Sequence, residues 1–142
     1  MTSFQKHYKG RFINMLRWSQ LDQLWDKVKA QPEDWYIYFV GETTPITPAD
    51  AVALNHFIEE IDQLLHKEHQ YDYCGIVYAD NKEKPSMVKI FDPHNLGSSC
   101  GSSGIAIPPR WLLTRILPES IVDEAPIPNN RKRWWQRLFS IR

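Results

Sequence analysis

The chain is poor in cysteine: Cys74 and Cys100 are the only two among its 142 residues. A secreted disulfide scaffold would need more, so we expect both thiols to be free in a reducing cytoplasm. The first twelve residues are polar and basic, so we expect no secretory signal here. No stretch approaches the roughly 18–20 apolar residues that span a membrane. These absences favour a cytoplasmic protein.

The chain as a whole has no net charge, but its charges are unevenly distributed along the sequence. The chain has 17 basic and 17 acidic residues, and five of the basic residues fall within 131–142, which contains no acid. Residues 1–130 keep 12 basic and 17 acidic residues, a net charge of −5, against +5 for the end. An acidic body is therefore joined to a basic end, whose charge favours contact with acidic surfaces or phosphates.

Apolar periodicity predicts two main helices. The first covers residues 11–30, where apolar side chains recur at helical spacing until Pro32 ends the pattern. The second runs from about Pro48 to about Lys67, with Thr47 as the predicted N-cap.

Apolar runs predict strands at 35–40, 73–79 and 87–91, with a hairpin loop at 80–86. The strand–helix–strand step between the first two strands predicts a parallel crossover. Residues 109–117 suggest a short further helix. We therefore expect an α/β fold, with α+β as the alternative. Its small mixed sheet would have about three strands and two main packed helices, followed by an irregular C-terminal third.

This pattern divides the chain into three parts. Residues 1–117 form a single α/β domain, 118–130 a proline-rich acidic linker, and 131–142 a basic, aromatic tail. If helical, the tail places apolar side chains on one side and basic ones on the other, as interfacial and docking helices do. The candidate binding residues are Arg131, Lys132, Arg133, Trp134, Trp135, Arg137, Leu138 and Phe139.

Four surfaces are candidates to receive this tail: the acidic body itself, a partner protein, a membrane surface and a nucleic acid. Self-packing would bury the large apolar side chains, which are costly to leave in water. An acidic body repels phosphates, so nucleic acid is the least favoured. The sequence does not indicate an oligomeric state.

The glycine- and serine-rich run at 97–104 is the other feature with chemical character. Asp92, His94 and Cys100 lie within nine residues, and a cysteine with a base and an orienting carboxylate is a candidate nucleophile. The same run is also compatible with an anion-binding nest or with a plain connection. Its match to the G-x-S-x-G pattern carries no argument, because no strand precedes it and no helix follows.

The histidines have helical spacings that zinc sites also use. His66 and His69 are three residues apart, and His56 and Glu60 are four apart. Two such residues do not make a site, and Cys74 as a further ligand is more typical of a small buried side chain. We therefore expect no metal and no cofactor.

Together these patterns predict a non-enzymatic accessory or interaction protein that docks on a partner through its basic, tryptophan-rich tail. The alternative is a small thiol-dependent enzyme or sulfur carrier that uses Cys100, with His94 and Asp92 assisting.

The thiol hypothesis makes a direct prediction. In a Cys74→Ala background, Cys100 should react with iodoacetamide near pH 6–7 much faster than an ordinary thiol with a pKa of about 8.5. The measurement is the alkylation rate against pH. An ordinary or absent reactivity would contradict the hypothesis.

Overall fold

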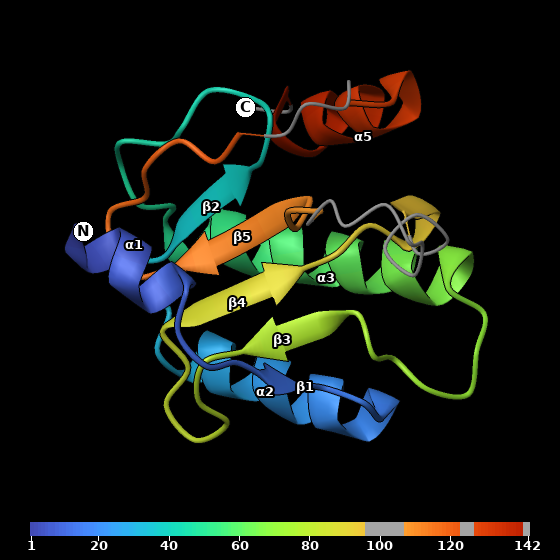
Figure 1. The fold of residues 1–142 in the computed structure, drawn as a ribbon. Coiled ribbons are helices and arrows are strands. Elements are labelled where there is room, and N and C mark those ends of the chain that lie inside the picture. The colour runs from blue at the N-terminus through green and yellow to red at the C-terminus, as the bar shows by residue number, and fades with distance from the viewer. Residues whose placement is uncertain (96–106, 123–126, 141–142) are drawn as a thin grey trace.

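The computed structural model describes residues 1–95, 107–122 and 127–140. Within them the chain forms a five-stranded antiparallel sheet and four α-helices, an α/β arrangement (Figure 1). The elements in chain order are α1 (Ser3–Tyr8), β1 (Ile13–Asn14), α2 (Trp18–Ala30), β2 (Tyr36–Phe39), α3 (Ala51–Glu68), β3 (Val77–Ala79), β4 (Met87–Ile90), the 3₁₀-helix η1 (Pro93–Asn95), β5 (Trp111–Thr114) and α5 (Asn129–Ser140).

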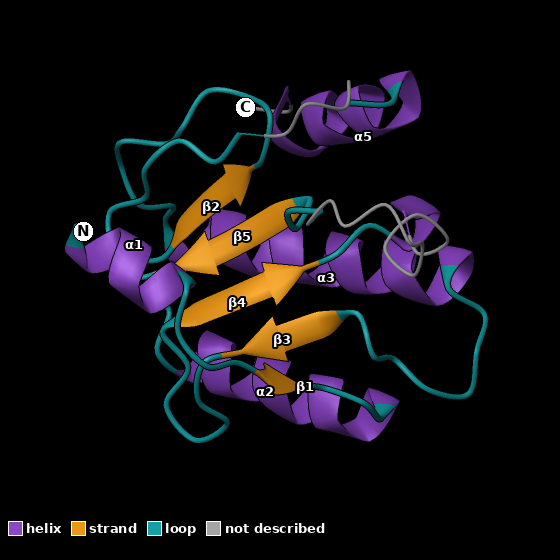
Figure 2. Ribbon diagram, in the orientation of Figure 1, coloured by secondary structure: helices purple, strands orange, loops and turns teal. Residues whose placement is uncertain are grey.

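The sheet corrects our expectation of about three strands in a mixed sheet. Its order is β1-β3-β4-β5-β2, and every neighbouring pair is antiparallel. Helices α2 and α3 cover one face and α1 lies on the other (Figure 2). The hairpin of β3 and β4 is confirmed, with Val77 opposite Ile90.

The predicted parallel crossover is wrong. Strands β2 and β3 are separated by β5 and β4, and three successive antiparallel pairings make them antiparallel to each other. The reason lies in the loop 41–50, which returns to the start of β2, where the Ala49 N–H donates to the Trp35 carbonyl (2.8 Å). Helix α3 therefore runs in the same sense as β2, whereas a parallel crossover needs a helix that runs back along the strand.

Residues 109–117 contain strand β5 (Trp111–Thr114) in place of the expected short helix. All four residues of β5, Trp111–Thr114, are buried, because the strand pairs with β4 and β2 and both its faces are covered. Such a strand is a continuous apolar run, which periodicity cannot distinguish from a buried helical segment.

Both main helices begin later than predicted. Residues 13 and 14 pair with β3 as β1, so α2 begins only at Trp18. Asp50 is the N-cap of α3, and its Oδ1 accepts a hydrogen bond from the Ala53 N–H (2.8 Å). Thr47, the predicted cap, lies three residues earlier in an exposed loop.

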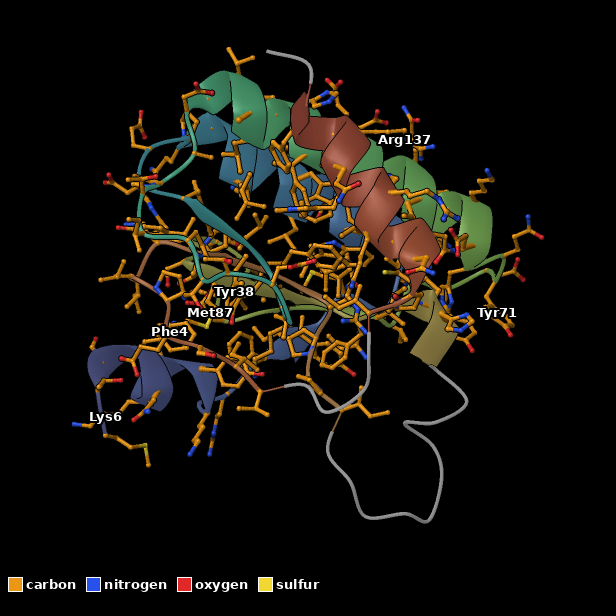
Figure 3. All side chains as sticks on the ribbon, turned by 90° about the horizontal axis from the view of Figure 1, so that it is seen from above. Phe4, Lys6, Tyr38, Tyr71, Met87 and Arg137 are labelled. Atoms are coloured by element: carbon orange, nitrogen blue, oxygen red, sulfur yellow. The ribbon has the colours of Figure 1, made fainter. Side chains whose placement is uncertain are left out.

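The sheet has an apolar core on each face. The larger core lies under α2, α3 and α5, and Leu21, Leu54 and Phe57 are among its fully buried members. The smaller one lies under α1, where Phe4 meets Tyr38 and Met87 (Figure 3). Within the described residues, no helix has the length and apolar character needed to cross a bilayer.

Asp50→Ala should lower the free energy of unfolding by about 1 kcal/mol, because it removes the hydrogen bond that caps α3. Thr47→Ala is the matched control and should change stability by less than about 0.5 kcal/mol. Urea unfolding followed by circular dichroism measures both. Equal losses would contradict the assignment of Asp50 as the cap.

Candidate functional site

The chain before α5 is held against the body. Ile121 donates its N–H to the Tyr38 hydroxyl (2.9 Å), and Ile127 is buried. Gly41, at a φ of 102°, makes room for Ile127, since a Cβ on this glycine would lie 2.8 Å from the Ile127 Cδ1. The Pro128 carbonyl then accepts the N–H of Arg131 (3.0 Å), which starts the helical hydrogen bonding of α5.

Arg131 joins α5 to two other segments through a group that we call the Arg131 cluster: Arg131, Asp92, Glu68 and Arg110. Arg131 donates from Nε and Nη2 to the two carboxylate oxygens of Asp92 (3.0 and 2.9 Å). It also donates from Nη1 and Nη2 to Glu68, the last residue of α3 (2.8 and 2.7 Å). The Arg110 Nε lies 3.7 Å from Asp92. One guanidinium thus ties α5 to the end of α3 and to the segment after β4.

Arg131, Asp92 and Arg110 are buried, which makes their pairing energetically important, whereas the side chain of Glu68 is 36% exposed. The side chains of Arg131 and Asp92 are only 2% and 1% exposed. Burial alone would raise the pKa of Asp92, but hydrogen bonds from Arg131 and from the His94 N–H hold that pKa below its usual value. Hydrogen bonds from Arg131 also lower the pKa of Glu68. Burial opposes the charge of Arg131, but the two carboxylates outweigh it and raise the arginine pKa. Arg131, Asp92 and Glu68 therefore remain ionised at neutral pH.

The apolar side of α5 also packs against the body. The Trp134 ring packs against Trp111 at 5.5 Å between centroids, and Trp135 packs against Phe39 at 4.9 Å. Both tryptophans also contact the edge of Phe57 on α3. The two indoles are half-buried as a result.

The opposite side of α5 faces solvent and is basic. Its exposed residues include Lys132, Arg133, Gln136 and Arg137, with no acidic residue anywhere in the helix. In Figure 3, α5 crosses in front of α3, and the label marks Arg137 of α5. The predicted binding residues thus fall into three groups. Those that contact the body are Arg131, Trp134, Trp135, Leu138 and Phe139. Lys132 and Arg133 project from the body, and Arg137 is exposed beside α3, where it lines a groove with Glu60 and Glu68.

Of the proposed thiol site, the structure describes Asp92 and His94 but not Cys100. Asp92 contacts His94 through the backbone N–H (2.9 Å), and its carboxylate oxygens are engaged by Arg131. The side chain of His94 is exposed on η1. Cys100 and the whole run 97–104 lie outside the described residues, so the thiol hypothesis stays a prediction.

His66 and His69, which we weighed as metal ligands, both contact the Trp18 ring but have different polar partners. His69 is buried, and its Nε2 lies 2.7 Å from the Cys74 carbonyl oxygen. His66 stacks on Trp18 at 4.0 Å between ring centroids. Together with Asp22 and Asp62, His66 forms a group whose ligand atoms lie within 4.8 Å of one another. Sequence spacing did not indicate this group, because Asp22 comes from another helix.

The contacts among Ser86, Asp80 and His7 were not predicted from the sequence. Ser86 donates its hydroxyl to Asp80, and the same nitrogen of His7, Nε2, lies 2.7 Å from Asp80 and 3.3 Å from Ser86. A catalytic triad needs the serine and the carboxylate on opposite nitrogens of the ring. This arrangement therefore holds α1 to the β3–β4 hairpin and does not activate Ser86.

Lys89 lies on the face of the sheet covered by α1. Its Nζ donates to the Tyr8 carbonyl (2.7 Å) and lies 4.2 and 4.0 Å from the ring centroids of Tyr8 and Phe12. Burial lowers the pKa of Lys89 to about 8. The aromatic rings stabilise the ammonium and fix α1 over the sheet.

No protein-family model, curated protein or solved structure matches this chain.

Arg131→Met should lower the free energy of unfolding by about 3–5 kcal/mol, because it leaves the Asp92 carboxylate buried without its main partner. Arg133→Met, on the exposed side of the same helix, is the matched control and should cost less than about 0.5 kcal/mol. Urea unfolding monitored by tryptophan fluorescence measures both.

Arg131→Met should also change how the free energy of unfolding depends on pH. The lowered pKa of Asp92 stabilises the native protein above the unfolded value of about 3.9, and this contribution is lost as the pH falls through the lower folded pKa. Without Arg131, burial raises the pKa of Asp92, so protonation then relieves the buried charge. Acid should therefore destabilise the parent protein more than Arg131→Met. Parallel stability–pH curves would contradict the role of the Arg131 cluster.

Proposed function

We propose that this protein is a non-enzymatic interaction module of the cytoplasm that docks on an acidic surface of a partner protein through the exposed basic face of α5. The observation that carries the proposal is the division of α5 into two sides. Its aromatic side packs on α3 and the sheet, while Lys132 and Arg133 face solvent on a helix that lacks acids.

This division favours a protein partner over a membrane. A helix that lies in a bilayer interface inserts its apolar face among the lipids. In α5, Trp134 and Trp135 are the large residues of that face, and both pack against the core. Insertion would require α5 to detach, which would separate Arg131 from its two carboxylates.

The charge of the body argues against nucleic acid. Residues 1–130 carry a net charge of −5, so phosphates attracted to α5 would be repelled by the rest of the molecule. A folded partner can present a local acidic patch that meets α5 alone. Electrostatic complementarity of this kind contributes chiefly to specificity and to the rate of association.

The charge reversal K132E/R133E tests this function. It should weaken binding of a polyglutamate peptide at least about tenfold, because like charges then face each other. K82E/K84E is the matched control: it makes the same change of charge on the exposed β3–β4 loop and should leave affinity nearly unchanged. Fluorescence anisotropy of the labelled peptide measures both.

If both variants lose the same affinity for the peptide, binding depends only on the net charge of the protein, which would contradict docking through α5. Binding of anionic phosphatidylserine vesicles that exceeds binding of the peptide would point to the membrane alternative and would also overturn the proposal.

A further inference from the structure

The groove between α2 and α3 is acidic. It has a volume of about 380 Å³ and is lined by four carboxylates and one lysine, a net charge of −3: Asp22, Asp26, Glu59, Asp62 and Lys29. Three of the four carboxylates are exposed. Trp25 and Ile58, both buried, also line it and provide apolar surface beneath the charges.

The basic face of α5 does not reach this groove in its own chain. Helix α3 lies between them, with α2 packed along one side and α5 along the other (Figure 3). The Arg131 cluster and the packing of Trp134 on Phe57 hold α5 in that position. Helix α5 borders two other grooves: one has a mixed lining that includes Glu60, Lys67 and Glu68, and the other lies beside Asp50 at the start of α3.

The two surfaces also match in spacing. Asp22 and Asp26 are four residues apart on α2, so they are neighbours about 6 Å apart on one helix face. Arg133 and Arg137 are likewise four residues apart, so α5 also has two charges one turn apart, with Lys132 beside them. A basic helix face with this repeat can therefore place its charges opposite the carboxylates of an acidic groove.

We infer that the acidic partner of α5 is a second copy of this chain, with the basic face of α5 from one copy seated in the α2–α3 groove of the next. The inference rests on the proposed function and names its partner. The contact is heterologous: each complex leaves one groove and one basic face unused, so association should grow with concentration. It should also weaken at high salt, because the charges are exposed.

A charge-swap experiment tests this. K132E/R133E removes the basic face and keeps the acidic groove, whereas D22K/D26K reverses one wall of the groove and keeps the basic face. Each variant alone should sediment at the monomer mass of 16.7 kDa. Their equimolar mixture should associate, because an intact groove on one meets an intact α5 on the other.

The measurement is sedimentation equilibrium of the full chain at low ionic strength and at about 1 M salt, where the Debye length is only about 3 Å. The parent protein should show a mean mass that rises with concentration and returns toward the monomer in high salt. K82E/K84E, with both surfaces intact, is the control and should behave as the parent does. Circular dichroism verifies that each variant is folded, and Glu59→Lys on α3 replaces D22K/D26K if that variant is not.

A parent protein that stays monomeric at low salt, or a mixture of folded variants that does not associate, would overturn self-association. Retained polyglutamate binding through α5 would then leave the proposed function standing with a foreign acidic partner. Loss of both would overturn the two proposals together.

Discussion

The contact of the buried Arg131 with Asp92 and Glu68 fixes where α5 lies, and the arrangement of surface charge depends on that position. A guanidinium that is 2% exposed is tolerated only because its donors meet two carboxylates in good geometry. Since Arg131 is the third residue of α5, this contact sets the rotation of the helix about its own axis. The residues that follow, Lys132 and Arg133, are then turned to solvent.

The position of α5 separates the positive and negative surfaces of the molecule. Helix α3 places the acidic α2–α3 groove on one flank and the basic helix on the other. Had α5 packed into the groove, the charges would have cancelled within one chain. The neutral total of the sequence is therefore distributed as two complementary surfaces on different sides of one molecule.

Sequence patterns predicted the elements whose signal is local. The apolar stripe of α3 and the β3–β4 hairpin repeat at their own periods, so a short window contains all the information. Strand β5 was missed because both of its faces are covered, which removes the alternation that identifies a strand. The antiparallel topology was missed because it depends on the loop 41–50 and its single long-range hydrogen bond from Ala49 to Trp35.

The candidate site shows the same limit. The two-sided character of the tail was visible in the spacing of its residues, but the partners of Arg131 lie 63 and 39 residues away. Nothing in the sequence near Asp92 indicates that an arginine from the far end of the chain occupies its carboxylate. Proximity to His94 and Cys100 therefore suggested a catalytic role for a carboxylate that, in the fold, forms ion pairs with two arginines and accepts the His94 backbone N–H.

The two kinds of charge contact also differ in their sensitivity to salt. Exposed charges lose most of their interaction once the Debye length, about 8 Å at physiological ionic strength, falls below their separation, whereas buried pairs are screened far less. Arg131 and Asp92 are buried and in direct contact, so salt screens their attraction only weakly. Lys132 and Arg133 are exposed, so contacts made through them respond to ionic strength. The attachment of α5 through the buried Arg131 should therefore depend less on salt than any contact made through Lys132 and Arg133.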